Sequence, residues 1–401
     1  MDQEKVLLIV SLMLCFLRLS SAANYNVMQF GAKGDGVTDD TMAFERAWQE
    51  VCNDVGPSSR LTIPMPNTFL VGPITFQGPC KSPLIHIQIL GTIIAPQNPS
   101  SWNGCETGAW LLFYKVNGLF IDGGGTINGR GDAWWTKSST YITEESKCTI
   151  PPTALHFESC NGLRLTKLKH RNSPRNHIGL NRCSYSTLSY LDIAAPADSP
   201  NTDGIDISLS TQVRVHHSII RTGDDCIALS NGSSQINITG IYCGPGHGIS
   251  IGSLGMNGQY NTVEGVKVRK CQFSGTTNGA RIKTWQGGSG YARDITFEKI
   301  FLHNVNNPII IDQHYCPHNY NCPKESSAVK VNDISYKRFV GTSSSRTAIN
   351  FDCSNNVACS GILLDHINIT SSVKGEDPTV YCNNAYGTTS FSSPTASCLL
   401  N

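Results

Sequence analysis

The 401-residue chain has almost no net charge, because 31 Lys and Arg residues balance 30 Asp and Glu residues to a formal charge of +1. Such a balance excludes a global electrostatic attraction to nucleic acid or to an anionic membrane. Charged residues are also sparse, at 15% of the sequence. Any acidic ligand must therefore be bound by local cations.

The chain also lacks an apolar run long enough to span a bilayer. Its most apolar stretch, residues 6–17, is short and leads to the small residues at 20–23. This pattern is typical of a secretory signal peptide, with a weak membrane anchor as the alternative. We expect residues 1–23 to be removed, residues 24–401 to form one domain, and no stable membrane association.

No C-x-x-C motif is present, which argues against a zinc site. The 16 cysteines are nevertheless many for a cytosolic protein and indicate an oxidising compartment. Fifteen follow the apolar stretch that contains Cys15, so one thiol is expected to stay unpaired. Short spacings suggest the pairs Cys226–Cys243, Cys353–Cys359 and Cys382–Cys398, with Cys316–Cys322 and Cys52–Cys80 as further options. Export would allow glycosylation at the sequons of Asn231, Asn237 and Asn368.

One short unit recurs in the middle of the sequence. Asp203, Asp225 and His247 are 22 residues apart, and each precedes a short alternation of apolar residues. The equivalent position in flanking units is occupied by Asn176, Asn278 and Asn307. A period in the twenties with one strand per repeat is typical of a solenoid of stacked parallel strands. Equivalent residues would then stand about 4.8 Å apart in a ladder.

Outside the repeats, a strand is expected over 26–30, followed by the one substantial helix that the sequence predicts. Residues 38–40 supply its N-cap, and Met42, Ala43, Ala47, Trp48 and Val51 form an apolar face. Such a helix would cap the open end of a solenoid. The Trp134-Trp135 pair is interpreted as packing rather than as a platform for a sugar.

The ladder brings together Asp203, Asp224, Asp225 and His247. Burying three carboxylates together is unfavourable unless protons or cations offset their charge, so we interpret the group as chemical. Hydrolysis of a glycosidic bond requires one carboxylic acid and a second carboxylate. Repulsion between like charges would raise at least one pKa and keep a proton available for the acid.

Arg281 and Lys283 lie one repeat further along, on the same side of a strand. A guanidinium beside an ammonium is suited to binding a carboxylate, which indicates an acidic sugar. Two other interpretations of the region remain open. Residues 248–252 match the G-x-S-x-G motif of serine hydrolases, although no helix is predicted after Ser250. The Asp and His cluster could also bind a divalent cation.

Four segments of this sequence resemble the signature segments of the polygalacturonases of glycoside hydrolase family 28, in particular the plant branch. They are Asn201-Thr202-Asp203, Gly223-Asp224-Asp225, Gly246-His247-Gly248 and Arg281-Ile282-Lys283. The resemblance implies a right-handed parallel β-helix that hydrolyses α-1,4-galacturonosyl bonds of de-esterified pectin with inversion. It further implies a secreted cell-wall enzyme whose partner is a pectic polysaccharide and which needs no cofactor or metal. We expect a monomer.

The resemblance also implies roles for individual residues. Asp224 would be the general acid assisted by His247, and Asp203 and Asp225 would activate water. The galacturonate carboxylate would be bound by Arg281 and Lys283, with Asn201 lining the site. The ladder by itself does not predict inversion. Its rungs are about 4.8 Å apart, closer than the roughly 6.5–9.5 Å usual between the two carboxyl groups of inverting enzymes. Inversion is therefore implied by the resemblance alone.

Three alternatives of other classes stay open. A pectate lyase would show a calcium cluster and an Arg base. A rhamnogalacturonan or xylogalacturonan hydrolase would keep the acids but change the sugar-binding loops. A non-catalytic pectin-binding β-helix would be expected to lose an Asp of the ladder, and none is lost. Endo or exo action is not readable from the sequence.

Overall fold

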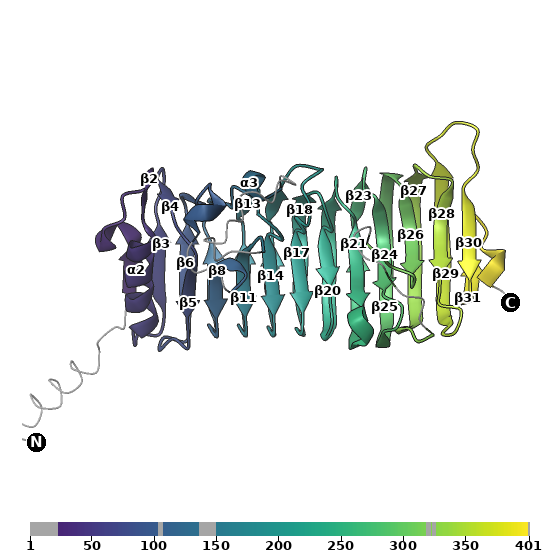
Figure 1. Cartoon of the computed structure of the whole chain (residues 1–401), viewed down its shortest axis with the longest axis horizontal. Coiled ribbons are helices and arrows are strands. Elements are labelled where there is room, and N and C mark those ends of the chain that lie inside the picture. Colours follow the sequence, from purple (N-terminus) through teal and green to yellow (C-terminus); the bar gives the residue numbers. More distant parts are fainter. Residues whose placement is uncertain (1–22, 103–106, 136–149, 318–321, 323–325, 400–401) are drawn as a thin grey trace, which may run out of the picture.

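The computed structural model describes residues 23–102, 107–135, 150–317, 322 and 326–399. Its strands wind into a right-handed parallel β-helix, which Figure 1 shows from the side as a row of neighbouring arrows between α2 and β31. The predicted signal peptide lies, except for Ala23, outside the described residues. Within the described part of the chain, no helix is long and apolar enough to cross a membrane.

Two parallel sheets form the walls of the β-helix, and sheet B contributes one strand per coil. Sheet B consists of β5 (Ile74–Gln77), β8 (Ala109–Tyr114), β11 (Thr153–Glu158), β14 (Ile178–Asn181), β17 (Ile205–Ser208), β19 (Ile227–Leu229), β21 (Ile249–Leu254), β24 (Asn278–Thr284), β26 (Asn307–Asp312), β28 (Thr347–Asp352) and β30 (Thr379–Asn383). Alternate residues of these strands point into the core, for example Ile205 and Ile207 of β17.

Sheet A forms the rest of each coil. Its strands are β1 (Ala23–Asn26), β2 (Asp35–Asp39), β3 (Ser59–Ile63), β4 (Thr68–Leu70), β6 (Ile85–Ile89), β7 (Thr92–Ile94), β9 (Leu119–Asp122), β10 (Thr126–Asn128), β12 (Arg164–Thr166), β13 (Lys169–Arg171), β15 (Thr187–Ser189), β16 (Asp192–Ala194), β18 (Arg214–Arg221), β20 (Ser233–Cys243), β22 (Tyr260–Arg269), β23 (Gln272–Ser274), β25 (Ser289–Val305), β27 (Lys330–Ser343), β29 (Cys359–Ser371) and β31 (Ala385–Ser390). Early coils cross sheet A as two short strands, whereas most later coils use one long strand that bends at a residue of positive φ, such as His217 (φ 50°).

The register confirms the predicted repeat. Successive strands of sheet B pair Ile178 with Ile205, Ile205 with Ile227, and Ile227 with Ile249. These isoleucines are fully buried, and burial of each side chain contributes about 1.5–3 kcal/mol. The ladder residues stand two positions before them, at the turn that enters each strand of sheet B.

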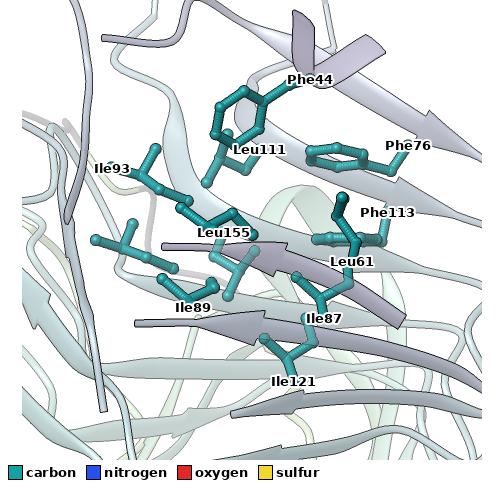
Figure 2. Close-up of a pocket in the computed structure, with 12 residues that line it drawn as sticks. Phe44, Leu61, Phe76, Ile87, Ile89, Ile93, Leu111, Phe113, Ile121 and Leu155 are labelled. Atoms are coloured by element: carbon teal, nitrogen blue, oxygen red, sulfur yellow. The ribbon is translucent and has the colours of Figure 1, made fainter. Parts of the chain in front are cut away.

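The predicted capping helix is confirmed as α2 (Thr41–Asn53). Figure 2 shows its Phe44 above Phe76, Leu111 and Phe113 of sheet B. These and other apolar side chains enclose a cavity of about 20 Å³, room for one water molecule but without polar partners for it. The first coil is thus closed by packing of apolar side chains.

The sequence misassigned two details near this cap. Met42, expected on the apolar face, is exposed, and Phe44 is buried instead. The strand expected over 26–30 is wrong, because β1 ends at Asn26 and η1 (Val27–Phe30) is a 3₁₀ helix. Asn26 and Gln29 form a capping box, whose side-chain bonds compete locally with strand pairing.

The far end is closed by η5 (Ser397–Leu399), where Leu399 is buried and the Cys382–Cys398 disulfide ties the tail to β30. Two further 3₁₀ turns are η2 (Pro99–Ser101) and η4 (Met256–Gly258). The Trp pair falls in α3 (Asp132–Trp135), where Trp134 meets Trp102 edge-on at 5.5 Å and the Trp135 indole donates to the Ser173 carbonyl. Both contacts agree with the packing interpretation.

All five suggested disulfides form. The expectation of one free thiol is wrong, because three buried cysteines are free within the described residues: Cys160, Cys183 and Cys271. Cys160 and Cys183 occupy equivalent positions in adjacent coils and donate to the carbonyl oxygens of Phe113 and Phe157 at 3.4 Å. The odd number of cysteines could not show how many of them stay free. Buried positions of a coil accept a free thiol because it packs there as a small apolar residue.

Candidate active site

The candidate site lies at the turns that enter β17, β19 and β21, together with the outer face of β24. Gly248 separates His247 from β21 and has a φ of +83°. A Cβ at this position would lie 2.2 Å from the Asn278 carbonyl oxygen, so the turn requires glycine. The turn places the His247 side chain one coil from Asp225.

Asp225 is the buried centre of the site, with no exposed side-chain area. Its Oδ1 accepts hydrogen bonds from Ser250 Oγ at 2.8 Å and from the Arg281 guanidinium at 2.5 Å. Its Oδ2 accepts from Lys283 Nζ at 2.9 Å. Burial raises the pKa of Asp225, but Arg281 and Lys283 outweigh burial and hold the pKa at about 2. Asp225 is therefore a carboxylate at any physiological pH.

The two cations were predicted to bind a substrate carboxylate, and the structure shows that both already bind Asp225. Burial lowers the pKa of Arg281 and of Lys283, but the Asp225 carboxylate outweighs burial and raises both. Arg281 Nε also donates to Ser250 Oγ at 2.8 Å. Ser250 thus bridges Asp225 and Arg281, a role that sequence reasoning missed.

Asp224 lies beside this buried group and is partly exposed, with 23% of its side chain accessible. Its Oδ1 lies 2.9 Å from His247 Nδ1 and accepts the backbone N–H of Asp225 at 2.8 Å. The predicted pairing of His247 with this carboxyl is therefore present. Because both contacts use Oδ1, the other oxygen of Asp224 is the one placed to exchange a proton with a ligand.

Asp203 differs electrostatically from Asp225. Burial, followed by the neighbouring carboxylates of Asp206, Asp224 and Asp225, raises the pKa of Asp203 well above its ordinary value. The Asp203 carbonyl oxygen lies 3.2 Å from Nδ1 of the buried His177. His177 Nε2 accepts the Ser173 N–H, so Nδ1 carries the proton and donates to that carbonyl. His177 fixes the backbone that carries Asp203.

The carboxyl of Asp206 is a further acidic group that the sequence interpretation left out. It stands in register between Gly179 and Ala228, two residues too small to cover it from either side. Its Oδ1 is buried and has no hydrogen-bond partner within the described residues. Burial, followed by the Asp225 carboxylate, raises its pKa to about 7. The signal in the sequence is the alternation Ile205-Asp206-Ile207, in which the two isoleucines point into the core and Asp206 points outward.

The predicted site residues thus lie close together, except that Asn201 makes no contact with the others that could be described. Contacts link Asp224, Asp225, His247, Arg281 and Lys283, and Asp203 interacts electrostatically with Asp224 and Asp225. Asn201 is exposed two residues before Asp203 and has a φ of +53°. Lys283 Nζ also lies 5.3 Å from the ring centre of Tyr315, which packs edge-on against Trp285. These two aromatic residues extend the site beyond β24.

Comparison with known proteins places this geometry in a family. The family model for glycosyl hydrolases family 28 matches residues 52–398. The chain belongs to this family. It is 48% identical to a probable polygalacturonase of Arabidopsis thaliana, with 96% of this chain and 83% of that protein aligned. It is 45% identical to a polygalacturonase of Persea americana, over 91% of this chain and 78% of that protein.

Solved structures agree at the level of the fold. An endo-xylogalacturonan hydrolase from Aspergillus tubingensis superimposes with a TM-score of 0.77 at 24% identity, covering 92% of this chain and 100% of that chain. A polygalacturonase from Erwinia carotovora superimposes with a TM-score of 0.73 at 23% identity, covering 92% of this chain and 96% of that chain. The solenoid predicted from the repeat and the parallel β-helix implied by the family resemblance are therefore confirmed.

The family 28 site disagrees with the serine hydrolase interpretation. Ser250 lies inside β21, is fully buried, and donates to Asp225 instead of pairing with a histidine base. A nucleophile elbow needs a sharp turn between a strand and a helix, and β21 continues as a strand to Leu254. The motif at 248–252 is therefore a repeat strand.

A divalent cation is a weaker interpretation of the same cluster. One ligand atom each from Asp224, Asp225 and His247 lie within 4.8 Å of one another. Asp225, however, already has two cations on its oxygens. A metal ion would have to displace Lys283 or Arg281 or share Asp225 with them, which like-charge repulsion opposes.

Asp206 gives this site a testable pH dependence. Unfolded aspartate titrates near pH 3.9, whereas folded Asp206 titrates at about 7. Between these values the folded protein keeps a proton that the unfolded chain has released, so the free energy of unfolding should decrease as pH rises from about 4 to about 7. In Asp206→Asn this decrease should be smaller, as measured by Tm across that range.

The exposed variant Asp377→Asn, which removes the same charge from a loop, is the control and should keep the wild-type slope. Asp203 acts in the same direction, so some slope should remain in Asp206→Asn. Identical slopes for Asp206→Asn and wild type would contradict the assignment of a proton to Asp206.

Proposed function

We propose that this family 28 protein is a polygalacturonase that hydrolyses the α-1,4-galacturonosyl bonds of de-esterified pectin. The observation that carries the proposal is the Asp225 carboxylate held by Arg281 and Lys283 beside the Asp224–His247 pair. It combines an ionised carboxylate, a carboxyl able to donate a proton, and cations for an acidic sugar. Plant relatives named as polygalacturonases share the family over most of this chain.

In the proposed reaction, Asp224 protonates the glycosidic oxygen as the bond to the anomeric carbon breaks. A water molecule, activated by Asp225 with Asp203, attacks that carbon from the opposite face, which inverts its configuration. The proton lost by water passes to Asp225, the ionised carboxylate of the pair. His247 contacts Asp224 Oδ1 and thereby orients the oxygen that carries the proton.

Arg281 and Lys283 serve two purposes in this proposal. They hold Asp225 ionised, and their heads offer further N–H donors to the carboxylate of a galacturonate next to the scissile bond. Asn201 would line the edge of the site. A sugar without a carboxylate would leave the donors on the cations unused, so we expect discrimination against it.

The alternatives are less well supported by the same contacts. A lyase would need Arg281 as a base, but its guanidinium is bound to Asp225 and Ser250, and the pKa of an arginine is raised further there. A non-catalytic binding protein would have no need for a buried carboxylate that two cations hold ionised. We further propose removal of residues 1–23, export to the cell wall, a monomeric state, and catalysis without a cofactor or metal.

The test is incubation of the mature protein with polygalacturonate in the absence of calcium at about pH 5, near the range where carboxyl acids and bases act. Reducing ends should increase without new ultraviolet absorbance, and product sizes will distinguish endo from exo action. An increase in absorbance would indicate elimination and overturn the hydrolase assignment. No new reducing ends from any pectic polymer would indicate a binding protein.

A further inference from the structure

One face of sheet A carries regularly spaced residues that the proposed reaction does not use. It is formed by the second parts of β18, β20, β25, β27 and β29, together with β23, which lie side by side in the C-terminal half of the molecule (Figure 1). One residue from each of these strands stands in register: Ile219, Tyr242, Gln272, Phe301, Val340 and Asn368. At about 4.8 Å per coil, this row is about 24 Å long.

The row is mostly apolar and open to solvent. Its four apolar members are exposed, Ile219 by 42%, Tyr242 by 37%, Phe301 by 53% and Val340 by 43%. An aligned set of exposed apolar side chains on a sheet marks an interaction surface more often than single exposed residues do. No element among the described residues covers the row, and the sequon at Asn368 lies at its end, two coils beyond Phe301.

A second row runs parallel to the first, two positions earlier in each strand. Its members are His217, Gly240, Lys270, Lys299, Arg338 and His366, and each has a positive φ because the strand bends there. The bend turns these side chains outward, and all five that have one are exposed. Neither row contains an acidic residue. We call the two rows together the basic-aromatic face.

The charge of this face is only partly neutralised by its surroundings. Glu298 pairs with Arg338 at 3.1 Å, and Asp365 pairs with His366 at 2.7 Å. The ion pairs found among the described residues do not include Lys270 or Lys299. These two lysines flank Gln272 and Phe301 in adjacent coils and provide the free positive charge.

We propose that the basic-aromatic face is a second binding surface for an acidic polysaccharide, which anchors a polymer chain outside the catalytic site. The proposal rests on the proposed function for the identity of the polymer. The apolar face of a pyranose ring would pack on Tyr242 and Phe301, two coils or about 9.6 Å apart. Carboxylates of the same polymer would lie against Lys270 and Lys299.

Charge complementarity favours this occupant over a second copy of the chain. A symmetric dimer through this face would place the same patch of both copies together and bring their basic rows close to each other. An acidic polymer instead supplies the opposite charge at a regular spacing. Each exposed contact is weak, but contacts add up for a ligand that is also held elsewhere on the protein.

The face should therefore affect long substrates and not short ones. A long chain can occupy the face with one segment and the catalytic site with another, whereas a short oligogalacturonate can occupy only one of them. We expect Lys270→Asn with Lys299→Asn, or Tyr242→Ser with Phe301→Ser, to raise the KM for polygalacturonate by about threefold to tenfold. Both kcat and the KM for trigalacturonate should remain at wild-type values. Asn is chosen for the lysines because it tolerates their left-handed backbone.

The matched controls are Lys33→Asn with Lys374→Asn, which removes two exposed charges elsewhere, and Tyr260→Ser, which removes an exposed aromatic ring elsewhere. The effect of the lysine pair should disappear at high salt. An unchanged KM ratio between polymer and trimer in both double variants would overturn the inference, as would a wild-type dimer that dissociates in the Tyr242→Ser, Phe301→Ser variant. Absence of hydrolysis of either substrate by wild type would instead overturn the proposed function.

Discussion

Replacing Asp224 with Asn is expected to lower kcat on polygalacturonate by about 100- to 10,000-fold, the usual contribution of a general acid. Asn has the same shape and can still accept the Asp225 N–H and the contact from His247, so the geometry at Oδ1 is kept. It has no proton to give to the leaving oxygen. KM and Tm should therefore stay near their wild-type values while kcat falls.

This variant also tests which carboxyl supplies the proton. The raised pKa of Asp203 makes that residue the rival acid on electrostatic grounds alone. Asp224 is favoured by its partial exposure and by its contact with His247. A steady-state comparison of Asp224→Asn and Asp203→Asn, with Asp377→Asn as the control of equal charge, separates them. Retention of most of kcat in Asp224→Asn would transfer the role to Asp203.

Replacing Asp225 is expected to destabilise the protein as well as inactivate it. Asp225→Asn leaves Arg281 and Lys283 nearly buried without an opposite charge, since only 13% and 10% of their side chains are exposed. Breaking a buried pair from one side costs about 3–5 kcal/mol. The decrease should appear in the free energy of unfolding measured with denaturant at pH 7.

The chain contains a matched control for this effect. Asp192 also binds two cations, Arg171 at 2.5 Å and Arg221 at 2.9 Å, but all three side chains are substantially exposed. Asp192→Asn should therefore cost less than about 1 kcal/mol. Equal losses for the two aspartates would show that burial of the charges around Asp225 is not what makes it important.

A compensating variant distinguishes buried charge from lost packing. Its four apolar replacements are Asp225→Leu, Ser250→Ala, Arg281→Met and Lys283→Met. Apolar replacement of a whole buried ionic group is often neutral or stabilising, so this variant should regain most of the stability lost in Asp225→Asn while remaining inactive. A further loss would mean that the group stabilises the fold by itself.

Much of the fold was predictable because the same short unit is repeated. The 22-residue spacing of Asp203, Asp225 and His247 gave the register of sheet B, since the residues two positions later pair in that order. Close spacing along the chain also predicted the disulfides. The 3₁₀ turn at 27–30 was missed because a capping box formed by side chains outweighs the local strand pattern there.

The residues that make up the site were predictable, but the contacts between them were not. Sequence alternation placed Arg281 and Lys283 on one side of a strand, yet it could not show that both reach Asp225, more than 50 residues earlier. Ser250 was weighed only as a possible nucleophile, and it is the bridge between Asp225 and Arg281. His177 and Asp206 act through burial and through neighbours in other coils, which only the stacking of coils reveals.

The two closed ends of the coil stack decide how far the repeat can grow. The backbone N–H and C=O groups of each coil form hydrogen bonds with the next coil. An uncovered end would leave these groups unpaired and able to bind a strand of another chain. Here α2 lies over the first coil, and the tail with η5, held by Cys382–Cys398, lies against the last. Polymerisation of the protein into fibres by coil addition is thereby blocked in both directions, and the molecule keeps a fixed length.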